Sequence, residues 1–496
     1  MNMNNPLFIG VIFVPLLCVA LGLLIGRHRT WQHLLIFGGG VVAWLCSLAL
    51  LAANFNSGIQ TYRLGGWAPP YGIVFVADKL SAVFAAMATT VVMAGLLYAL
   101  GCKDKCVTYP AFMPLFATMG VGLSGALYTG DIFTLFVFVE LMVISSTALV
   151  AISDNRLGLE AAIKYLFISA MGSLFLLIAI GSIYTTFGTL TIADIAQKLA
   201  TGERPLLAQA AAVMLTCAFL LKSAVFPFHF WQPDFHTTAP TPVHAVLSSV
   251  VVKVGVYGLI RMITTLFIAE APIIQSLLVV LGVIGIFFGS LGALRTYDAK
   301  RMLAYSTFGQ IGFILVAIGW GTPLALIGAL VYAVNHSFIK AALLMLTGVV
   351  SSRTYGKTAT KREIGGVGKG MVLTSILYLL GGMALAGMPP LNGFISKVAL
   401  VQGGIEAQGW IALVLAVAAG LITLQYMIGT WSLLFQQPPD EGVKAKPYGD
   451  AQFAPLFLIS LCVLFGLYAT PLIDVVTRTV ADLGDPTLYI RAVFGG

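Results

Sequence analysis

The chain has 496 residues, of which 59% are hydrophobic and only 9% are charged, and its mean hydropathy is +0.97. A water-soluble fold of this size cannot hide so much apolar surface, so the composition excludes one and predicts an all-α, polytopic membrane protein. The formal net charge of +8 does not indicate nucleic-acid binding, because the basic residues gather in short loops between apolar runs.

Runs of about 20 apolar residues predict roughly fourteen transmembrane helices, since that length crosses the hydrocarbon core of a bilayer. The first run, Pro6 to Gly26, lacks a basic start and a small-residue cleavage site, so we expect a retained helix. Loops after odd-numbered spans carry about twice as many Lys and Arg residues as the other loops, which predicts that both termini lie outside. The spans are expected to be centred near residues 16, 42, 90, 119, 142, 173, 217, 253, 281, 311, 338, 387, 421 and 462.

Two of the predicted spans are interrupted by proline and glycine. The seventh, over about 206–231, contains Pro227, and the twelfth, over about 371–403, contains Pro389 and Pro390. Neither stretch can continue as one helix, because proline removes a backbone donor and clashes with the preceding turn. In transporters, helices broken at corresponding places in two halves point to the ion site. The alternative is that Pro and Gly are simply frequent in membrane helices.

The spacing of the breaks also predicts an internal repeat. Five spans separate them, and an odd number of helices inserts a second copy upside down, so we expect two inverted five-helix repeats. The predicted domains are an N-terminal three-helix segment over 1–107, a first repeat (spans four to eight) over 108–268, a second (spans nine to thirteen) over 269–436, and a C-terminal helix and tail over 437–496.

The ionisable residues inside the apolar runs are few, and almost all are lysines. A charge at the bilayer centre costs at least about 2.5 to 3.5 kcal/mol, so such residues normally mark an ion or proton path. Lysine can release its proton when buried, whereas arginine effectively cannot. An interior with lysines, one carboxylate and no arginine therefore predicts reversible protonation. The residues are Lys164, Lys222, Lys253, Lys340 and Lys397, with the carboxylate of Glu140.

Glu140 is expected near the bilayer centre. It lies nine residues beyond Asp131, which at 1.5 Å per residue is a depth of roughly 13 Å. An unpaired carboxylate at that depth would remain protonated, so we expect a cationic partner and assign Lys222; a purely structural pair is the alternative. Lys164 follows Glu160 by four residues, and a local pair at the membrane edge explains it as well as transport does.

The remaining candidates are expected to carry protons onward. Lys253 has apolar neighbours within its span and lies too deep to reach an interface. His336 and Lys340 are four residues apart on one helix face, where a neutral imidazole can pass a proton between its two nitrogens. A packing role for the histidine is the alternative. Lys397 follows the second break by seven residues and is expected to end the row.

Four residues around the first break, His229, Asp234, His236 and His244, are candidates for proton uptake. His229 and His236 could equally cap the broken helix, and both interpretations stay open. Their spacing matches no common metal-ligand motif, and the six cysteines offer a single close pair, so no metal site is predicted. No nucleotide or haem motif occurs in the sequence, so no cofactor is expected.

Six motifs between about residues 65 and 400 are Gly130-Asp-Ile-Phe-Thr-Leu-Phe-Val-Phe-Val-Glu140, Phe226-Pro-Phe-His-Phe-Trp-Gln-Pro-Asp234, Ala239-Pro-Thr-Pro-Val243, Val252-Lys-Val-Gly-Val-Tyr257, Asn335-His-Ser-Phe-Ile-Lys340 and Gly387-Met-Pro-Pro-Leu-Asn-Gly393. In these motifs the chain resembles the antiporter-like membrane subunits shared by respiratory complex I, membrane-bound hydrogenases and multisubunit Na+/H+ (Mrp) antiporters. The resemblance implies a fourteen-helix subunit with a proton channel through each inverted half. It also implies that Glu140 and Lys222 form a modulating ion pair, that Lys253 and His336 are central relays, and that Lys397 is the terminal protonatable site.

Within this superfamily, the stretch Gly65-Gly-Trp-Ala-Pro-Pro-Tyr-Gly-Ile73 before Asp78, together with Lys397, is most similar to the D-subunit branch of the Mrp antiporters. His244 departs from the pattern, because relatives usually have serine there. The resemblance implies partner membrane subunits in a hetero-oligomer, movement of H+ and Na+, and a multi-pass location in the bacterial cell membrane. The alternative is a proton-pumping subunit of a redox-driven enzyme complex, whose redox centres would lie in other subunits.

Overall fold

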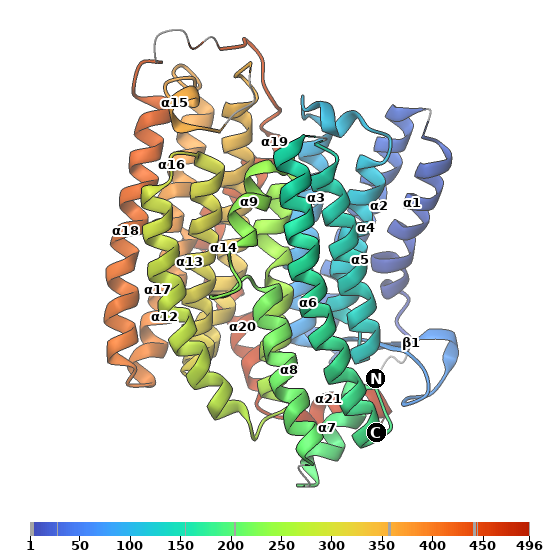
Figure 1. Cartoon of the computed structure of the whole chain (residues 1–496). Helices are drawn as coiled ribbons and strands as arrows, with labels where there is room; N and C mark the ends of the chain where they lie inside the picture. Colours follow the sequence, from blue (N-terminus) through green and yellow to red (C-terminus); the bar gives the residue numbers. More distant parts are fainter. Residues whose placement is uncertain are drawn as a thin grey trace.

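The computed structural model describes residues 4–26, 28–153, 155–202, 205–355, 359–439, 443 and 445–495. The chain is mainly helical, and most of its helices run side by side along the long direction of Figure 1. Within the described residues, nine helices are long and apolar enough to cross a membrane, and a bent pair near the C-terminus can form a tenth crossing. The chain is therefore mostly helical, as expected of a polytopic membrane protein, and a short two-stranded hairpin departs from the all-α expectation.

The N-terminal region combines three apolar helices with a short antiparallel hairpin. The hairpin joins the second and third helices and sets Gln60 opposite Ala77. Asp78 follows the hairpin and caps the third helix, because its carboxylate accepts the backbone N–H of Ser81 at 3.0 Å. The elements are η1 (Ile9–Phe13), α1 (Val14–Leu24), α2 (Arg29–Ser57), β1 (Gln60–Arg63), η2 (Leu64–Gly66), β2 (Val74–Ala77), α3 (Lys79–Leu100) and η3 (Lys105–Thr108).

The next segment contains the first predicted break. Helix α8 ends at Lys222, five residues before Pro227, and the following helix, α9, begins at Trp231. A continuous helical run over Thr241–Leu266 then crosses the molecule and includes two π-helical stretches. The elements are α4 (Phe112–Tyr128), α5 (Ile132–Ala151), α6 (Arg156–Phe187), α7 (Ile192–Ala200), α8 (Leu206–Lys222), α9 (Trp231–Thr238), α10 (Thr241–Val246), η4 (Leu247–Val251), α11 (Lys253–Arg261) and η5 (Met262–Leu266).

The second predicted break lies between Ala386 and Asn392. One helix ends where Gly387 adopts a φ of +83°, a left-handed conformation that favours glycine and stops the helix. Both interruptions that the sequence indicates are therefore present. The elements of this segment are α12 (Ala271–Arg295), α13 (Ala299–Gly319), α14 (Pro323–Ser351), α15 (Lys361–Ile364), α16 (Val372–Ala386), α17 (Asn392–Glu406) and α18 (Trp410–Phe435).

The C-terminal region contains three helices, the first two of which form a bent pair. α19 (Phe453–Leu467) and α20 (Thr470–Leu483) meet at 80°, and α21 (Pro486–Phe494) follows. The bend lies at Tyr468, whose backbone is not helical, and Pro471 lies near the start of α20. Arg63 of β1 donates to the Val493 carbonyl at 3.2 Å, which ties α21 to the hairpin. Both chain ends consequently lie at the same end of the bundle (Figure 1).

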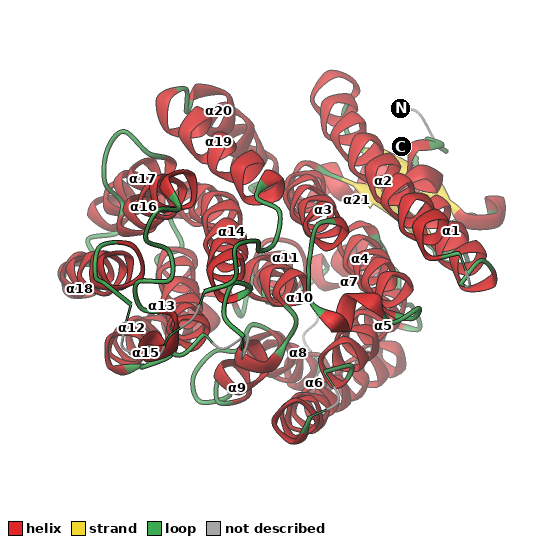
Figure 2. Ribbon diagram, turned by 90° about the horizontal axis from the view of Figure 1, so that it is seen from above, coloured by secondary structure: helices red, strands yellow, loops and turns green. Residues whose placement is uncertain are grey.

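The core lies around α14 and the Thr241–Leu266 run. In Figure 2, α14, α10 and α11 lie in the middle of the bundle, whereas α2, α6 and α18 lie at its rim. In each of these two central segments, an apolar stretch of 18 residues is 100% buried, compared with 28% for such a stretch in α2 and 39% in α18. Polar side chains on the central helices are therefore shielded from lipid, as an internal polar route requires.

Candidate functional site

Glu140 and Lys222 meet where α5, α6 and α8 come together. Lys222 Nζ lies 3.5 Å from Glu140 Oε1, 3.0 Å from Ser173 Oγ and 3.1 Å from the Ser169 carbonyl oxygen. Ser173 Oγ also donates to Glu140 Oε1, so one hydroxyl bridges the two charged groups. The Lys222 side chain is 6% exposed and that of Glu140 is 26% exposed. The structure thus brings the two residues together and adds a serine that the sequence analysis did not name.

The break after α8 gives Lys222 its position. Lys222 is the last residue of α8, where the free carbonyl groups of a helix end favour a cation. The next residue, Ser223, lies against Gly255, and any side chain at Gly255 would collide with the Ser223 hydroxyl. Gly255 follows Lys253 by two residues, so the broken end of α8 packs directly against the helix that carries Lys253.

Lys253 and His336 form the centre of the site. Lys253 Nζ lies 3.0 Å from His336 Nδ1 and also bonds to the Ser249 carbonyl one turn earlier in its own run. Lys253 is fully buried and His336 is 2% exposed. Ser337 Oγ donates to the same Ser249 carbonyl at 3.1 Å, which holds α14 against η4. The histidine is therefore a direct neighbour of one lysine and shares a helix face with another.

Lys340 lies one turn beyond His336 on α14 and is fully buried. Its Nζ lies 2.7 Å from Ser306 Oγ and 3.3 Å from the Leu303 carbonyl, both on α13. The ammonium group therefore points toward α13, and no hydrogen bond joins it to His336 in the described part of the chain. Oxygen atoms of a hydroxyl and a carbonyl surround the group in place of a carboxylate.

Lys397 lies apart from the other lysines, on α17 after the second break. Its Nζ donates to the Ala386 carbonyl at the end of α16, at 2.5 Å, and lies 5.9 Å from the centre of the Phe313 ring. The side chain borders a cavity of about 400 Å³ between α17 and α18, lined largely by apolar groups. The free carbonyl at the end of α16 is available only because the helix is broken there.

Asp234 lies in a solvent-exposed ion network. One carboxylate oxygen is 3.2 Å from Lys164 Nζ and the other is 3.2 Å from Arg301 Nη2. Lys164 also pairs with Glu160 at 2.6 Å, as the local alternative in the sequence analysis anticipated. The Lys164 and Arg301 side chains are both 43% exposed, so this network stands at the surface and not in the lysine row.

The three histidines near the first break have different surroundings. The rings of His236 and His244 stack at a centroid distance of 4.8 Å, and both residues are fully buried. None of their ring nitrogens has a hydrogen-bond partner among the described residues, so the pair offers four free polar positions to water or protons. His229 instead packs between Phe288 and Phe308, each at 4.6 Å. No group of three or more His, Cys, Asp or Glu side chains suited to a metal occurs in the described ranges.

One expectation about the interior is wrong. Arg261, at the end of α11, lies inside the Thr241–Leu266 run and is 4% exposed, although we expected no arginine within a span. Its guanidinium makes two bonds to Asp78, at 2.7 and 2.8 Å, and a third to the Tyr257 hydroxyl at 3.2 Å. A bidentate pair of this kind offsets the cost of burying arginine. The sequence did offer a signal for this ion pair, because Asp78 lies just before one apolar run and Arg261 lies near the end of another.

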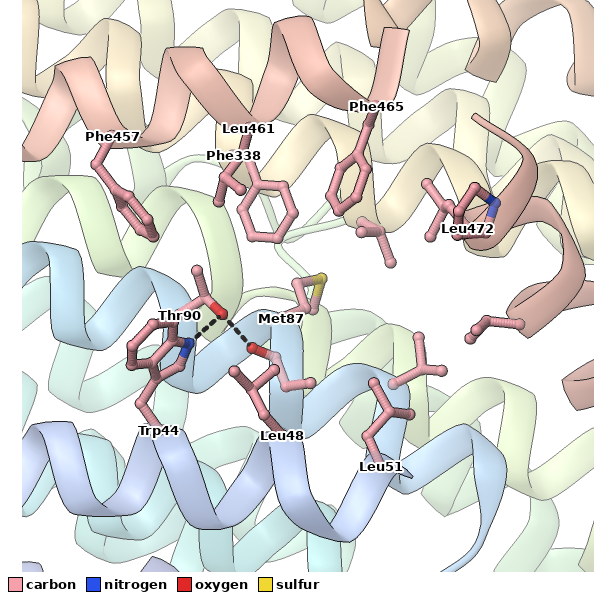
Figure 3. A pocket seen from close by; sticks show the side chains of 15 residues that line it. Trp44, Leu48, Leu51, Met87, Thr90, Phe338, Phe457, Leu461, Phe465 and Leu472 are labelled. Carbon is pink, nitrogen blue, oxygen red and sulfur yellow. Dashed lines mark hydrogen bonds between the residues drawn. The ribbon is translucent and has the colours of Figure 1, made fainter. Parts of the chain in front are cut away.

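A cavity on another side of α14 is almost entirely apolar. It measures about 310 Å³ and lies between α2, α3, α14, α19 and α20. Figure 3 shows its aromatic wall and two hydrogen bonds at Thr90, in the first of which Trp44 Nε1 donates to Thr90 Oγ1 at 2.9 Å. Thr90 Oγ1 in turn donates to the Ala86 carbonyl at 2.7 Å. An apolar cavity does not hold a chain of water. We therefore do not consider this cavity an alternative proton route to the buried lysines and His336.

Comparison with known sequences gives one consistent family. The family model described as NADH:quinone oxidoreductase/Mrp antiporter, TM, matches residues 129–423. The D subunit of the Na+/H+ antiporter of Alkalihalophilus pseudofirmus is 32% identical, over 99% of this chain and 99% of the relative. The D subunit of a probable K+/H+ antiporter of Rhizobium meliloti is 30% identical, over 99% of this chain and 97% of the relative.

Solved structures give the same result for the fold. A chain in the structure of the Mrp complex from Dietzia sp. superposes with a TM-score of 0.89 and 25% identity, over 98% of both chains. A chain of the membrane-bound sulfane sulfur reductase, an archaeal respiratory membrane complex, also has a TM-score of 0.89, with 26% identity over 98% of this chain and 99% of the other. Full-length superposition indicates that the whole chain, and not only residues 129–423, shares this architecture.

Proposed function

Because the chain belongs to the NADH:quinone oxidoreductase/Mrp antiporter family, we propose that it is the proton-translocating subunit of a multisubunit Na+/H+ antiporter. The observation that carries this proposal is the buried contact of Lys253 with His336, flanked by the Glu140–Lys222 pair and by Lys340. A static scaffold gains nothing from ionisable groups at the bilayer centre, which cost insertion energy.

The proposed route begins near the first break. Asp234 collects protons at the surface, and the unpartnered rings of His236 and His244 lie next along the way inward. His229 packs between the rings of Phe288 and Phe308. The mechanism assigns these four residues to proton uptake.

Protons then pass along the row of Lys222, Lys253, His336, Lys340 and Lys397. Charging one lysine disfavours a charge on its neighbour: two charges roughly 7 Å apart repel by about 2.4 kcal/mol at an effective dielectric constant of about 20. That repulsion moves a proton onward to the next vacant site. His336 suits the central position, because its two nitrogens can accept and release a proton on opposite sides.

The Glu140–Lys222 pair gates the route. When the two groups are in contact, as at the observed 3.5 Å, the carboxylate stabilises the charged lysine. When they separate, the lysine loses that stabilisation and releases its proton. Ser173 contacts both groups, so it can follow either one during this change.

The proposed architecture has fourteen crossings. The nine long helices, four shorter apolar helices and the bent α19–α20 pair together match that number. We assign 1–107 to an N-terminal segment, 108–268 and 269–436 to two inverted five-helix repeats, and 437–496 to a C-terminal part. The breaks at Lys222–Trp231 and Ala386–Asn392 support this division, since each falls in the fourth crossing of its repeat.

The proposed setting is the bacterial cell membrane, with both termini outside and other membrane subunits as partners. The common position of the chain ends in Figure 1 supports an even number of crossings. The relatives are named as antiporter subunits, and the Dietzia structure is of an Mrp complex, which supports a hetero-oligomer. Of the two relatives described above, one is named for Na+ and the other for K+, and we propose Na+ from the more similar of the two.

The test is transport by the whole complex in proteoliposomes without any reductant. We expect an imposed Na+ gradient to drive proton movement, detected by a pH-sensitive dye inside the vesicles. The second candidate function, a pump driven by redox chemistry in partner subunits, is favoured by the likeness to the sulfane sulfur reductase chain. If protons move only when an electron donor and acceptor are supplied, that second function replaces the first.

A further inference from the structure

A cavity outside the proposed proton route lies at the end of the bundle that carries α15 (Figure 1). It measures about 440 Å³ and is bordered by the residues after α14, the start of α16 and the start of α19. Its wall combines Arg353, Thr374, Asp450 and Gln452 with apolar side chains. A cavity of roughly 300 to 1,000 Å³ with a few polar groups is the usual form of a small-molecule site.

Three buried polar atoms in the wall of this cavity have no hydrogen-bond partner among the described residues. They are Arg353 Nε, Thr374 Oγ1 and Gln452 Oε1. Thr374 is fully buried, so its hydroxyl has no access to bulk water. Burying polar groups without partners is unfavourable, and native structures rarely leave several of them together. A ligand with both acceptor and donor atoms would satisfy all three.

The first residues of two helices add positive charge to the same wall. Met371 and Gln452 precede α16 and α19, and neither residue makes a side-chain capping hydrogen bond. The first N–H groups of a helix lack partners within it and carry partial positive charge. Lys369 lies three residues before α16, and the Lys446 N–H donates to the Arg353 carbonyl at 2.7 Å. Together these groups favour the binding of an anion.

Asp450 is the carboxylate in the wall, and other donors already occupy both of its oxygens. Oδ2 accepts a hydrogen bond from the Tyr98 hydroxyl at 2.7 Å, and Oδ1 accepts one from the Lys103 N–H at 2.7 Å. These bonds hold the carboxylate against the end of α3. Its negative charge is therefore partly offset by donors that do not belong to the cavity.

Two apolar residues that line the cavity are also exposed. Val372 is 68% exposed and Phe453 is 72% exposed, and they are the first residues of α16 and α19. Both helices are apolar, so the cavity lies at the ends of helices suited to a membrane. Basic pockets between such helices bind lipid headgroups. A phospholipid can place its phosphate in the polar part and its chains against these apolar groups, whereas a free phosphate ion would gain nothing from them.

We propose that this cavity binds the phosphate group of an anionic phospholipid. The Arg353 guanidinium, the Thr374 hydroxyl and the first N–H groups of α16 and α19 donate to the phosphate oxygens. Gln452 Oε1 accepts from a hydroxyl of the headgroup, which phosphatidylglycerol supplies. The acyl chains lie against Val372 and Phe453. The lipid then bridges the second predicted repeat and the C-terminal helix pair.

The test is cross-linking of a photoactivatable phosphatidylglycerol to the purified whole complex, followed by mass spectrometry of the labelled peptides. We expect label on peptides that contain Val372 or Phe453. Arg353→Gln should lower this label at least about tenfold, because a charged donor to the phosphate is lost. Thr374→Val should lower it about threefold to tenfold, since it removes a neutral donor of similar size. Gel filtration verifies that each variant complex is intact.

Two matched controls leave the cavity unchanged. Arg362→Gln removes a positive charge from the exposed surface of α15, at the same end of the bundle. Thr430→Val removes a buried hydroxyl of α18 that donates to the Tyr426 carbonyl at 2.8 Å. Both variants are expected to keep the label within about twofold of wild type.

Three outcomes would overturn the proposal. The first is equal labelling by a phosphatidylcholine with the same photoactivatable chains, since a net negative headgroup would then not be recognised. The second is unchanged labelling in both Arg353→Gln and Thr374→Val. The third is loss of the label on addition of inorganic phosphate at the concentration of the lipid, which would identify a free anion as the ligand. None of these results depends on Na+-driven proton flux, so this inference and the proposed function fail separately.

Discussion

At the scale of single residues, the interior lysines differ in their partners. Lys222 has a carboxylate at 3.5 Å, whereas Lys253, Lys340 and Lys397 contact imidazole, hydroxyl or carbonyl groups and form no ion pair in the part of the chain that the structure describes. The three lysines can therefore lose a proton without leaving a carboxylate unpaired. Arginine could not take their place, because its guanidinium remains charged at all relevant pH values.

Lys253→Arg tests this requirement directly. The substitution keeps the positive charge but prevents its release, so we expect proton flux to fall at least about tenfold while the complex still assembles. Flux is measured in proteoliposomes and assembly by gel filtration. Lys198→Arg on α7, where Lys198 pairs with Asp194 at the surface, is the matched control and should transport normally. Wild-type flux in Lys253→Arg would remove this residue from the route.

Glu140→Ala, Lys222→Ala and Lys397→Ala test the two ends of the row. Each removes a group that the mechanism requires, and each is expected to abolish Na+-driven proton flux without loss of assembly. Ser173→Ala removes only the bridging hydroxyl and should reduce flux by about threefold to tenfold. Normal flux in any of the three alanine variants would exclude that residue from proton movement.

At the scale of elements, a buried ion pair joins the start of α3 to the end of α11. Burial alone raises the pKa of Asp78, but the charge and hydrogen bonds of Arg261, with bonds from Ser81, lower it below its ordinary value of 3.8 overall. A carboxyl whose pKa is lowered on folding stabilises the folded state above its unfolded pKa. That contribution is lost only as the pH falls below 3.8 toward the folded-state value.

Asp78→Asn is expected to destabilise the protein by about 3 to 5 kcal/mol, because it leaves a buried guanidinium without a counter-charge. The measurement is the thermal unfolding midpoint of the purified complex at pH 7 and at pH 4, where wild type should retain the pair. Asp482→Asn breaks the more exposed pair with Lys79 and serves as the control, with an expected cost of no more than about 1 kcal/mol. Equal effects of the two variants would contradict the assignment.

The break between α16 and α17 depends on Gly387. A side chain there would adopt an unfavourable left-handed conformation and would meet the stem of Lys397. Gly387→Ala is expected to cost about 1 to 2 kcal/mol in stability and to reduce proton flux, since it displaces Lys397. Gly429→Ala, within α18 and with open space around its Cβ position, should have neither effect. The test compares the thermal unfolding midpoint and the proton flux of the two variants, and equal values would contradict the role of Gly387.

At the scale of the whole molecule, positive charge marks one end of the bundle. α15, with Lys361 and Arg362, lies at the end of the bundle opposite to the chain termini in Figure 1. From the positive-inside rule, we propose that this end lies in the cytoplasm and that the termini lie outside. The lysines of the proposed row lie on four different helices, α8, α11, α14 and α17.

Labelling with a membrane-impermeant maleimide tests this orientation. Thr201→Cys, after α7, should be labelled on intact cells, whereas Tyr297→Cys, at the end rich in basic residues, should react only after the membrane is permeabilised. Both positions are exposed, so access to reagent and not burial decides the result. The reverse pattern would invert the proposed topology and the direction of proton uptake.

The sequence was sufficient for features that depend on local composition or on single strong residues. It predicted the apolar crossings, both broken helices and the contact of Glu140 with Lys222, because burying a lone charge in lipid is costly and demands a partner. It did not indicate Ser173 or Ser306, since hydroxyl groups are common in membrane helices and have no characteristic spacing. The sequence analysis also failed to predict the buried Arg261, because its bidentate partner, Asp78, lies far away in the chain.

The amino-acid order by itself determined that this chain spans a membrane and where two of its helices break. These properties follow from hydropathy and from the backbone limits of proline and glycine, which act over short stretches. Only the tertiary structure decided which hydroxyl faces which lysine, and that the bare backbone at Gly420 lies beside Lys397. Such contacts join helices that are distant in sequence, and packing in three dimensions alone sets them.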